Sequence, residues 1–370
     1  MPDLIRCRAH VQFLAFVALA PTLVPSSVKA DVFDDFVLKG TFDLPSGADV
    51  FDVLTDGRIV VLAGADVYVE TTAGSRDFAL HGALPEPNLN PFAAFVRVSP
   101  DGTKMAVGDN LDRVGIFEIT TLSGSWFTAF HFDAEWYDDT RLALSGADLD
   151  NVTLLDITSP DPLDPINPVI IENINGAPAG IAFDSNGNLY TGNGLASGDP
   201  EETGEVRVFD HAAWTAVLEG GTPLDFFTNG TLVVDILSAA SLGFDVEGNL
   251  HVGGGDFIGG TDVDFAALVR ASAVRDAIMG LGPADPNDPA DVRQLDPDSD
   301  STFNFYTVNY NSVTEELYLM DFGATRVYVY AAPSTDIPTV SEWGLVIMIL
   351  SLLTVGTLTI RRRVARVFNP

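Results

Sequence analysis

LGFDVEGNLHVGGGD, residues 242–256, is one copy of a unit that recurs six times along the chain. In this unit an apolar strand is followed by a tight turn rich in Asp, Asn and Gly, and a second strand then ends in small or acidic residues. Two strands joined by such a turn are a strong sequence signal for a β-hairpin. The other five copies begin at Val50, Phe95, Ala134, Gly180 and Phe305.

Each hairpin is followed by further strands. Third strands are predicted after all six units, as in RVGIFEI from Arg113 and RVYVYA from Arg326. Fourth strands are predicted after the first five units, in RDFALHG, WFTAFHF, PVIIENI, TLVVDIL and DVRQL. The sixth unit has no fourth strand before Ala332, whereas FVLKGTFDL from Phe36 precedes the first unit and has no sheet of its own.

This accounting predicts an all-β fold, a six-bladed β-propeller over residues 31–332 in which the N-terminal strand completes the last blade and closes the ring. Closure is favourable because an open ring leaves strand edges exposed. The two longest spacings between units contain HAAWTAVLEG from His211 and ASAVRDAIMG from Ala271, which predict helices. A pair of β-sandwiches is the alternative fold, but it does not explain a regular unit repeated six times.

The turns of the fourth and fifth units, FDSNGNLY and FDVEGNLH, resemble repeats of the NHL and gluconolactonase-like propellers. Such motifs are shared by many propellers, so the resemblance implies a fold and not an activity. In gluconolactonase-like propellers a metal is held in the channel by acidic and amide side chains from separate blades. The resemblance makes Asn193 and Asp256 the nearest analogues of those ligands in this chain.

The first 30 residues have the form of a secretory signal peptide. Arg6 and Arg8 precede the apolar stretch 11–23, and Val28-Lys29-Ala30 offers a small-x-small cleavage site. A permanent N-terminal anchor is the alternative. Cys7 is the only cysteine, so an exported mature chain has no disulfide, no thiolate nucleophile and no cysteine-ligated metal.

The charge of the exported part is strongly negative. The whole chain carries 19 basic and 52 acidic residues, a net charge of −33. Residues 31–336 hold 12 of the basic and 50 of the acidic residues, a net charge of −38. A surface of this kind repels nucleic acid and anionic lipid, and it favours solubility and multivalent cations.

The segment 337–370 follows a short tether, residues 333–336, and has three parts. A motif comes first, an uncharged apolar run over 345–360 follows, and a basic cluster closes the segment. From Trp343 to Ile360 the length is close to the lower limit of a membrane-spanning helix. The arginines suit the cytoplasmic side of the membrane, which places the body of the protein outside the cytoplasm. The motif residues are Ile337, Pro338, Thr339, Trp343 and Gly344, and the basic residues are Arg361, Arg362, Arg363 and Arg366.

This segment resembles the C-terminal sorting signals that exosortases of Gram-negative bacteria recognise, in the class that opens Ile-Pro-Thr-Leu-x-x-Trp-Gly. Val340 stands where that class has Leu. The resemblance implies that signal peptidase and a membrane-bound exosortase act on the chain during export. It also implies transient anchoring through the C-terminal helix, followed by removal of the helix and release or attachment at the surface. An ordinary tail anchor is the alternative.

The sequence contains no recognisable catalytic motif. There is no Gly-x-Ser-x-Gly elbow, no Gly-rich phosphate loop between a strand and a helix, and no closely spaced His or Cys set that would hold zinc. His251 lies on a predicted inner strand, where a packed or channel-lining histidine is expected rather than a catalyst.

Calcium is the one metal for which the repeat offers ligands, since calcium takes carboxylate and carbonyl oxygens. An acid or amide follows the second strand of every unit, and equivalent positions of a propeller lie in a ring on one face. The six residues are Asp66, Asp109, Asp148, Asn193, Asp256 and Asp321, of which Asp109, Asn193, Asp256 and Asp321 are the candidate metal ligands. The competing interpretation is that Asp and Asn simply suit turns.

Two functions remain open on sequence alone. The first is a surface or matrix propeller without enzymatic activity that binds a polysaccharide, a protein or a cation through one face. The second is a metal-dependent hydrolase or lactonase with its site in the propeller channel. The sorting segment and the lack of catalytic motifs favour the first function, whereas the ring of Asp and Asn favours the second.

Overall fold

A computed structural model describes residues 36–48, 50–85, 94–109, 113–129, 131–146, 149–158, 168–175, 178–193, 204–255, 264–295, 306–321 and 325–331. The predicted signal peptide, tether and sorting segment lie outside these residues. Within the described ranges, no helix is long and apolar enough to cross a membrane.

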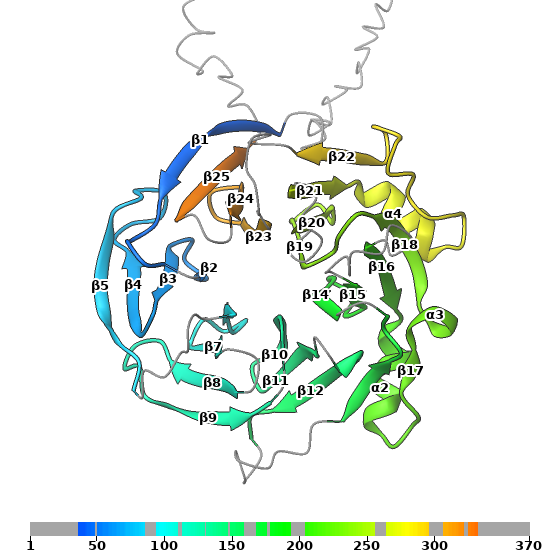
Figure 1. The fold of residues 1–370 in the computed structure, drawn as a ribbon, viewed down its shortest axis with the longest axis horizontal. Coiled ribbons are helices and arrows are strands. Elements are labelled where there is room, and N and C mark those ends of the chain that lie inside the picture. The colour runs from blue at the N-terminus through cyan, green and yellow to red at the C-terminus, as the bar shows by residue number, and fades with distance from the viewer. Residues whose placement is uncertain are drawn as a thin grey trace, which may run out of the picture.

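Six sheets, each with four antiparallel strands, stand around a common centre, which confirms the predicted six-bladed propeller (Figure 1). The inner strand of each blade contacts the inner strands of its two neighbours, so the six form a closed circle. In chain order the inner strands are β2 (Val50–Val53), β6 (Phe95–Val98), β10 (Ala134–Asp138), β14 (Pro178–Phe183), β19 (Ser241–Phe244) and β23 (Tyr306–Asn311). The second strands are β3 (Ile59–Ala63), β7 (Lys104–Gly108), β11 (Arg141–Ser145), β15 (Leu189–Asn193), β20 (Leu250–Gly255) and β24 (Glu316–Asp321).

The outer strands match the predicted third and fourth strands. The third strands are β4 (Asp66–Glu70), β8 (Arg113–Glu118), β12 (Val152–Asp156), β16 (Gly204–Phe209), β21 (Asp264–Val269) and β25 (Arg326–Ala331). The fourth strands of blades 1 to 5 are β5 (Phe78–Ala83), β9 (Gly124–Thr128), β13 (Val169–Glu172), β18 (Thr231–Ile236) and β22 (Val292–Leu295). Strand β9 starts two residues before the predicted WFTAFHF and ends at Thr128, because His131–Asp133 already lead into the next blade.

Blade 6 obtains its fourth strand from the other end of the chain. Strand β1 (Val37–Asp43) pairs antiparallel with β25, from Val37 opposite Ala331 to Asp43 opposite Arg326. The predicted closure of the ring by the N-terminal strand is therefore confirmed. Figure 1 shows β1 and β25 side by side although about 290 residues separate them in the sequence.

The helices lie at the ring's perimeter. The two predicted helices are α2 (His211–Leu218) and α4 (Ala271–Ile278), and each follows the third strand of its blade. Helix α3 (Phe226–Asn229) and the two-residue strand β17 (Leu224–Asp225) were not predicted. Strand β17 adds to blade 3 as a fifth strand, parallel to β13.

Apolar contacts between blades form the core. Strand β3 is apolar along its whole length because both of its faces are covered. Val60 and Leu62 pack with Val96 and Val107 of blade 2. On the other face of β3, Ile59 and Val61 pack with Tyr318 and Met320 of blade 6, and comparable clusters join each remaining pair of neighbouring blades.

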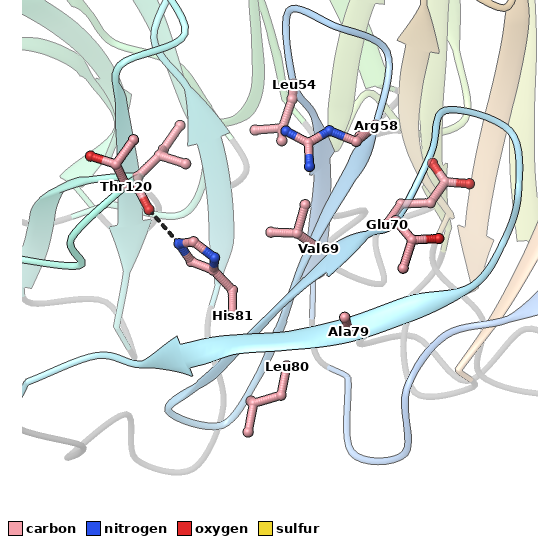
Figure 2. Close-up of a pocket in the computed structure, with 10 residues that line it drawn as sticks. Leu54, Arg58, Val69, Glu70, Ala79, Leu80, His81 and Thr120 are labelled. Carbon is pink, nitrogen blue, oxygen red and sulfur yellow. Dashed lines mark hydrogen bonds between the residues drawn. The ribbon is translucent and has the colours of Figure 1, made fainter.

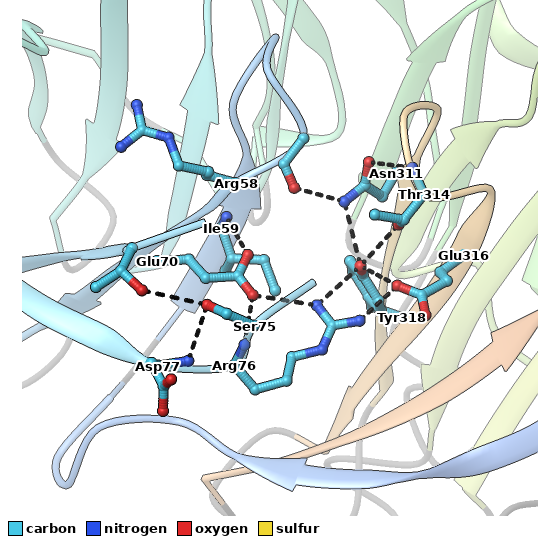
Figure 3. Close-up of polar contacts among 12 residues, drawn as sticks. Arg58, Ile59, Glu70, Ser75, Arg76, Asp77, Asn311, Thr314, Glu316 and Tyr318 are labelled. Carbon is cyan, nitrogen blue, oxygen red and sulfur yellow. Dashed lines mark hydrogen bonds and ion pairs between the residues drawn. The ribbon is translucent and has the colours of Figure 1, made fainter. Parts of the chain in front are cut away.

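Polar contacts also hold blade 1 to blade 6 (Figure 3). Arg76, between β4 and β5, donates from Nη1 to the Tyr318 hydroxyl at 3.0 Å and forms an ion pair with Glu316. Its backbone N–H donates to Oε1 of Glu70 at 2.7 Å, while Oε2 of the same fully buried carboxylate accepts from Ile59 N at 3.2 Å. The guanidinium also lies 4.7 Å from the ring centre of Phe42 in β1. One arginine thus joins both sides of the closure.

The hairpin turns of neighbouring blades nest closely. Gly57 and Gly102 adopt positive φ of 83° and 70°, which suits glycine. A Cβ at Gly57 would lie 2.6 Å from Cβ of Val313 in the turn of blade 6, and one at Gly102 would lie 2.5 Å from Oγ1 of Thr55 in the turn of blade 1. Glycine is needed at these turns for both backbone conformation and space.

Candidate functional site at the centre of the ring

One position of the inner strand can be compared across all six blades, because the strand pairing fixes its partner on the second strand. In blades 1 to 3 the inner-strand residue is charged and its partner is small or aliphatic. In blades 4 to 6 the inner-strand residue is small or an amide, and its partner is a large side chain with a polar group. The pairs are Asp52–Val60, Arg97–Ala106, Glu135–Ala143, Ala182–Tyr190, Gly243–His251 and Asn309–Tyr318.

Arg97 is the hub of the charged half. It is 8% exposed, and its Nη2 donates to Oδ1 of Asp133 at 2.6 Å. Its Nε donates to the carbonyl of Ala134 at 2.8 Å and lies 3.8 Å from Oε2 of Glu135. Trp136 completes the contact by donating from its indole N–H to the Arg97 carbonyl at 2.9 Å. All of these bonds run from blade 2 to blade 3 or to the residue that leads into it.

The neighbouring positions also reach across blade boundaries. Oδ2 of Asp52 in blade 1 accepts from the backbone N–H of Val98 in blade 2 at 2.6 Å. Nδ2 of Asn309 in blade 6 donates to the carbonyl of Phe51 in blade 1 at 3.1 Å. A chain of polar contacts therefore connects blades 6, 1, 2 and 3 along their inner strands.

The charges of this cluster do not balance. Three carboxyl groups, those of Asp52, Asp133 and Glu135, surround one guanidinium. Burial raises the pKa of Glu135 to about 8 and that of Asp133 to about 6, although the attraction of Arg97 opposes both shifts. Burial also raises the pKa of Asp52. These shifts favour the protonated form of Glu135 at neutral pH, which removes one of the two surplus negative charges and leaves Arg97 paired with the Asp133 carboxylate.

Among the described residues, the buried side-chain oxygens without a hydrogen-bond partner include one on the residue before β10 and one at the end of β15. Oδ2 of Asp133 is buried without one, while Oδ1 of the same carboxylate is bound to Arg97. Oδ1 of Asn193, at the end of β15, is also buried without a partner. Buried acceptors of this kind are rare, and each could accept a bond from water, a proton or a cation.

Hydrogen bonds fix the large side chains of the opposite half. His251 lies on the second strand β20 and not on the predicted inner strand. It is fully buried, as expected for a packed histidine, and its Nε2 lies 3.4 Å from Oδ2 of Asp245 in the hairpin turn. Tyr190 occupies the same position in blade 4 and donates its hydroxyl to Oδ2 of Asp184 at 3.2 Å. These side chains secure their own turns, so the ionised groups that lack a balanced partner concentrate in blades 1 to 3.

The predicted calcium ligands are placed as follows. Asp109 is 3% exposed, and its carboxylate binds the backbone N–H of Arg113 at 2.8 Å and the Arg113 side chain at 2.6 Å. Asn193 and Asp321 end their second strands, as expected. Asp66 is the exposed first residue of β4, whereas Asp148 and Asp256 lie outside the described residues.

Among the residues that the structure describes, no three His, Cys, Asp or Glu side chains are grouped so as to hold a metal ion. Calcium binding by Asp109, Asn193, Asp256 and Asp321 stays a prediction, with Asp109 already engaged by an arginine.

The cluster around Arg97 was missed on sequence. Aligning the six inner strands by their distance to the turn places Asp52, Arg97 and Glu135 at one position, and that charge pattern is the signal that would have found it. Asp133 carries no such signal, because it lies before the strand in a segment without a repeat.

No family model matches the chain, and no curated protein sequence matches it. Solved structures do match. A chain in the crystal structure of the mitotic checkpoint complex aligns with a TM-score of 0.51 and 13% identity, over 87% of this chain and 99% of that one. The PQQ domain of pyranose dehydrogenase from Coprinopsis cinerea aligns with a TM-score of 0.52 and 10% identity, over 80% of this chain and 97% of that one. At these identities the likeness shows the propeller fold alone.

Proposed function

We propose that this chain is an exported propeller without enzymatic activity, displayed at the surface or in the extracellular matrix of a Gram-negative-type bacterium, where it binds an extracellular polysaccharide. The observation that carries the proposal is that polar side chains on the inner strands form hydrogen bonds between neighbouring blades. Asp52, Arg97 and Asn309 bond across blade boundaries, so they act as fasteners of the ring. A rigid ring with its inner polar groups committed to its own blades suits presentation and binding.

The segments at the two ends of the chain direct its export and sorting, which together are called its address below. Residues 1–30 direct export through signal peptidase, and residues 337–370 direct recognition by an exosortase through Ile337, Pro338, Thr339, Trp343 and Gly344. The helix over 345–360 anchors the chain in the inner membrane until it is removed, with Arg361, Arg362 and Arg363 stopping transfer on the cytoplasmic side. The acidic body keeps the released protein soluble and away from nucleic acid and anionic lipid.

Mass spectrometry of the cell-associated protein tests this address. We expect a mature form that begins at Asp31 and lacks residues 345–360. Replacing Trp343 and Gly344 with alanine is expected to leave the helix in place and to hold the protein in the inner membrane. A mature wild-type protein that retains 345–360 would refute processing, and an unprocessed N-terminus would refute export by a cleaved signal peptide.

A second candidate function rests on a separate observation. The buried, unpartnered Oδ1 of Asn193 is an oxygen that a calcium ion would take, as a metal-dependent hydrolase or lactonase with its site in the channel would require. Calcium titration followed by thermal melting separates the two functions. The binding role predicts no rise in melting temperature beyond that of a sodium chloride control at equal ionic strength. A calcium-specific rise that is lost in Asn193→Ala would favour the enzyme.

A further inference from the structure

A cleft of about 250 Å³ lies between blades 1 and 2 (Figure 2). The turn between β2 and β3 provides Leu54 and Arg58, and the end of β4 provides Val69. Strand β5 provides His81, and Thr120 follows β8 on the other side. The cleft is slightly smaller than the ~300 Å³ at the lower end for drug-sized ligands, so it accommodates one small ring rather than an extended molecule.

The inner wall of the cleft is apolar. Leu54, Val69 and Ile119 are only 7%, 8% and 9% exposed, and they belong to the apolar cluster that joins the two blades. Leu80, by contrast, is 59% exposed and points to the far side of β5 (Figure 2). An apolar wall of aliphatic groups suits the C–H face of a sugar ring.

The orientation of His81 is fixed by the neighbouring blade. Its Nε2 lies 2.7 Å from the carbonyl oxygen of Ile119. A carbonyl oxygen only accepts, so Nε2 carries the proton and Nδ1 of the neutral ring is an acceptor. The imidazole thus contributes an acceptor to a site where Arg58 and the hydroxyl of Thr120 are able to donate, while the Thr71 hydroxyl is hydrogen-bonded to Oγ of Ser75.

The charge of the cleft is close to balanced. Arg58 donates from Nε to Oδ2 of Asp56 at 2.8 Å, and one of its two terminal nitrogens points toward Val69 (Figure 2). The Glu70 carboxylate beside the cleft is fully buried and accepts backbone N–H groups with both oxygens. No unbalanced charge therefore faces the cleft from these groups.

We infer that this cleft binds one residue of a neutral sugar chain. The inference rests on the proposed function and specifies its ligand. Sugar hydroxyls both donate and accept, which matches donors at Arg58 and Thr120 and an acceptor at His81. The net charge of −38 over residues 31–336 opposes the approach of an acidic polysaccharide, which favours the neutral class over the acidic one.

Isothermal titration of the purified protein tests the inference with trisaccharides prepared from dextran, mannan, galactan and alginate. We expect binding of at least one neutral trisaccharide and none of the acidic alginate trisaccharide. Arg58→Met and Thr120→Val are each expected to weaken that binding about fivefold, the effect of one hydrogen bond. Arg326→Met and Thr128→Val are the matched controls, an exposed arginine beside an aspartate and an exposed threonine at a strand end, and both should bind as the wild type does.

Each contrary result has a distinct meaning. If a neutral trisaccharide still binds as tightly to Arg58→Met and to Thr120→Val as to the wild type, the cleft is not the binding site, while the proposed function still stands. Binding of alginate in place of the neutral sugars would overturn the ligand class. Binding of none of the four would overturn the inference, and the proposed function would then be decided by the processing experiment and by binding to native polysaccharide. Melting temperatures of all four variants should equal that of the wild type, which excludes unfolding as the cause.

Discussion

Replacing Glu135 with glutamine should remove a specific loss of stability at rising pH. In the folded protein the pKa of Glu135 is raised to about 8, mainly by burial, from an ordinary value of 4.5. Between these values the folded state holds a proton that the unfolded state has released. The free energy of unfolding therefore falls as pH rises from about 4.5 to 8.

The size of the effect follows from the shift and the exposure. A shift of this extent corresponds to a ceiling of about 5 kcal/mol at ~1.4 kcal/mol per pKa unit. A third of the Glu135 side chain, 33%, remains exposed, so solvent screening reduces the effect, and we expect a loss of about 1–2 kcal/mol. Asp133 acts in the same direction below pH 6, which makes pH 6 to 8 the window in which Glu135 dominates the cluster.

Urea unfolding at pH 6, 7 and 8, followed by tryptophan fluorescence, measures this loss. The difference between wild type and Glu135→Gln isolates the carboxyl group, because the two proteins differ only at that side chain. Glu118→Gln, at the exposed end of β8, is the matched control and should keep the wild-type dependence. Equal pH dependence in wild type and Glu135→Gln, or a wild type that gains stability relative to the variant as pH rises, would refute the reasoning.

The remaining predictions concern the fasteners of the ring. Arg97→Met leaves the buried carboxylate of Asp133 without its cation and should lower the free energy of unfolding by about 3 kcal/mol or more. The double variant Arg97→Met/Asp133→Asn should recover part of this loss. Equal losses in the single and double variants would contradict the pairing. Arg76→Met should lower the free energy of unfolding by about 2 kcal/mol. Arg326→Met, whose ion pair with Asp43 is exposed, should change it by less than about 1 kcal/mol. Equal effects would show that the closure of the ring does not depend on Arg76. Gly57→Ala should destabilise the protein by at least about 1 kcal/mol more than Gly64→Ala, because both glycines have positive φ but only a Cβ at position 57 would meet Val313. Chemical denaturation measures the difference. Equal destabilisation would refute the close approach of the turns.

The fold could be predicted because its signals are local. Asp-Gly or Asn-Gly turns mark three of the six hairpins and a Glu-Gly turn marks a fourth, and the alternation of strands and turns fixes the number of blades. Closure followed from counting, since Phe36–Leu44 was a strand without a sheet and blade 6 was a sheet without a fourth strand. The helices at His211 and Ala271 were visible as excess length between units.

The polar architecture could not be predicted in the same way, because it depends on contacts between blades. Arg97 and Asp133 are 36 residues apart, and Arg76 and Glu316 are 240 apart. Asp109 illustrates the limit, because its position after a second strand suggested a metal ligand while its carboxylate binds Arg113 four residues later. Spacing within one repeat says which residues are equivalent, but it does not say which side chains meet across a blade boundary.

Co-sedimentation with the extracellular polysaccharide of the cells that display the protein is the most direct test of the proposed role. The purified wild-type protein is predicted to sediment with the polysaccharide at physiological salt, and Arg58→Met/Thr120→Val is predicted to remain in the supernatant. A wild-type protein that stays in the supernatant at every polysaccharide concentration would contradict the account.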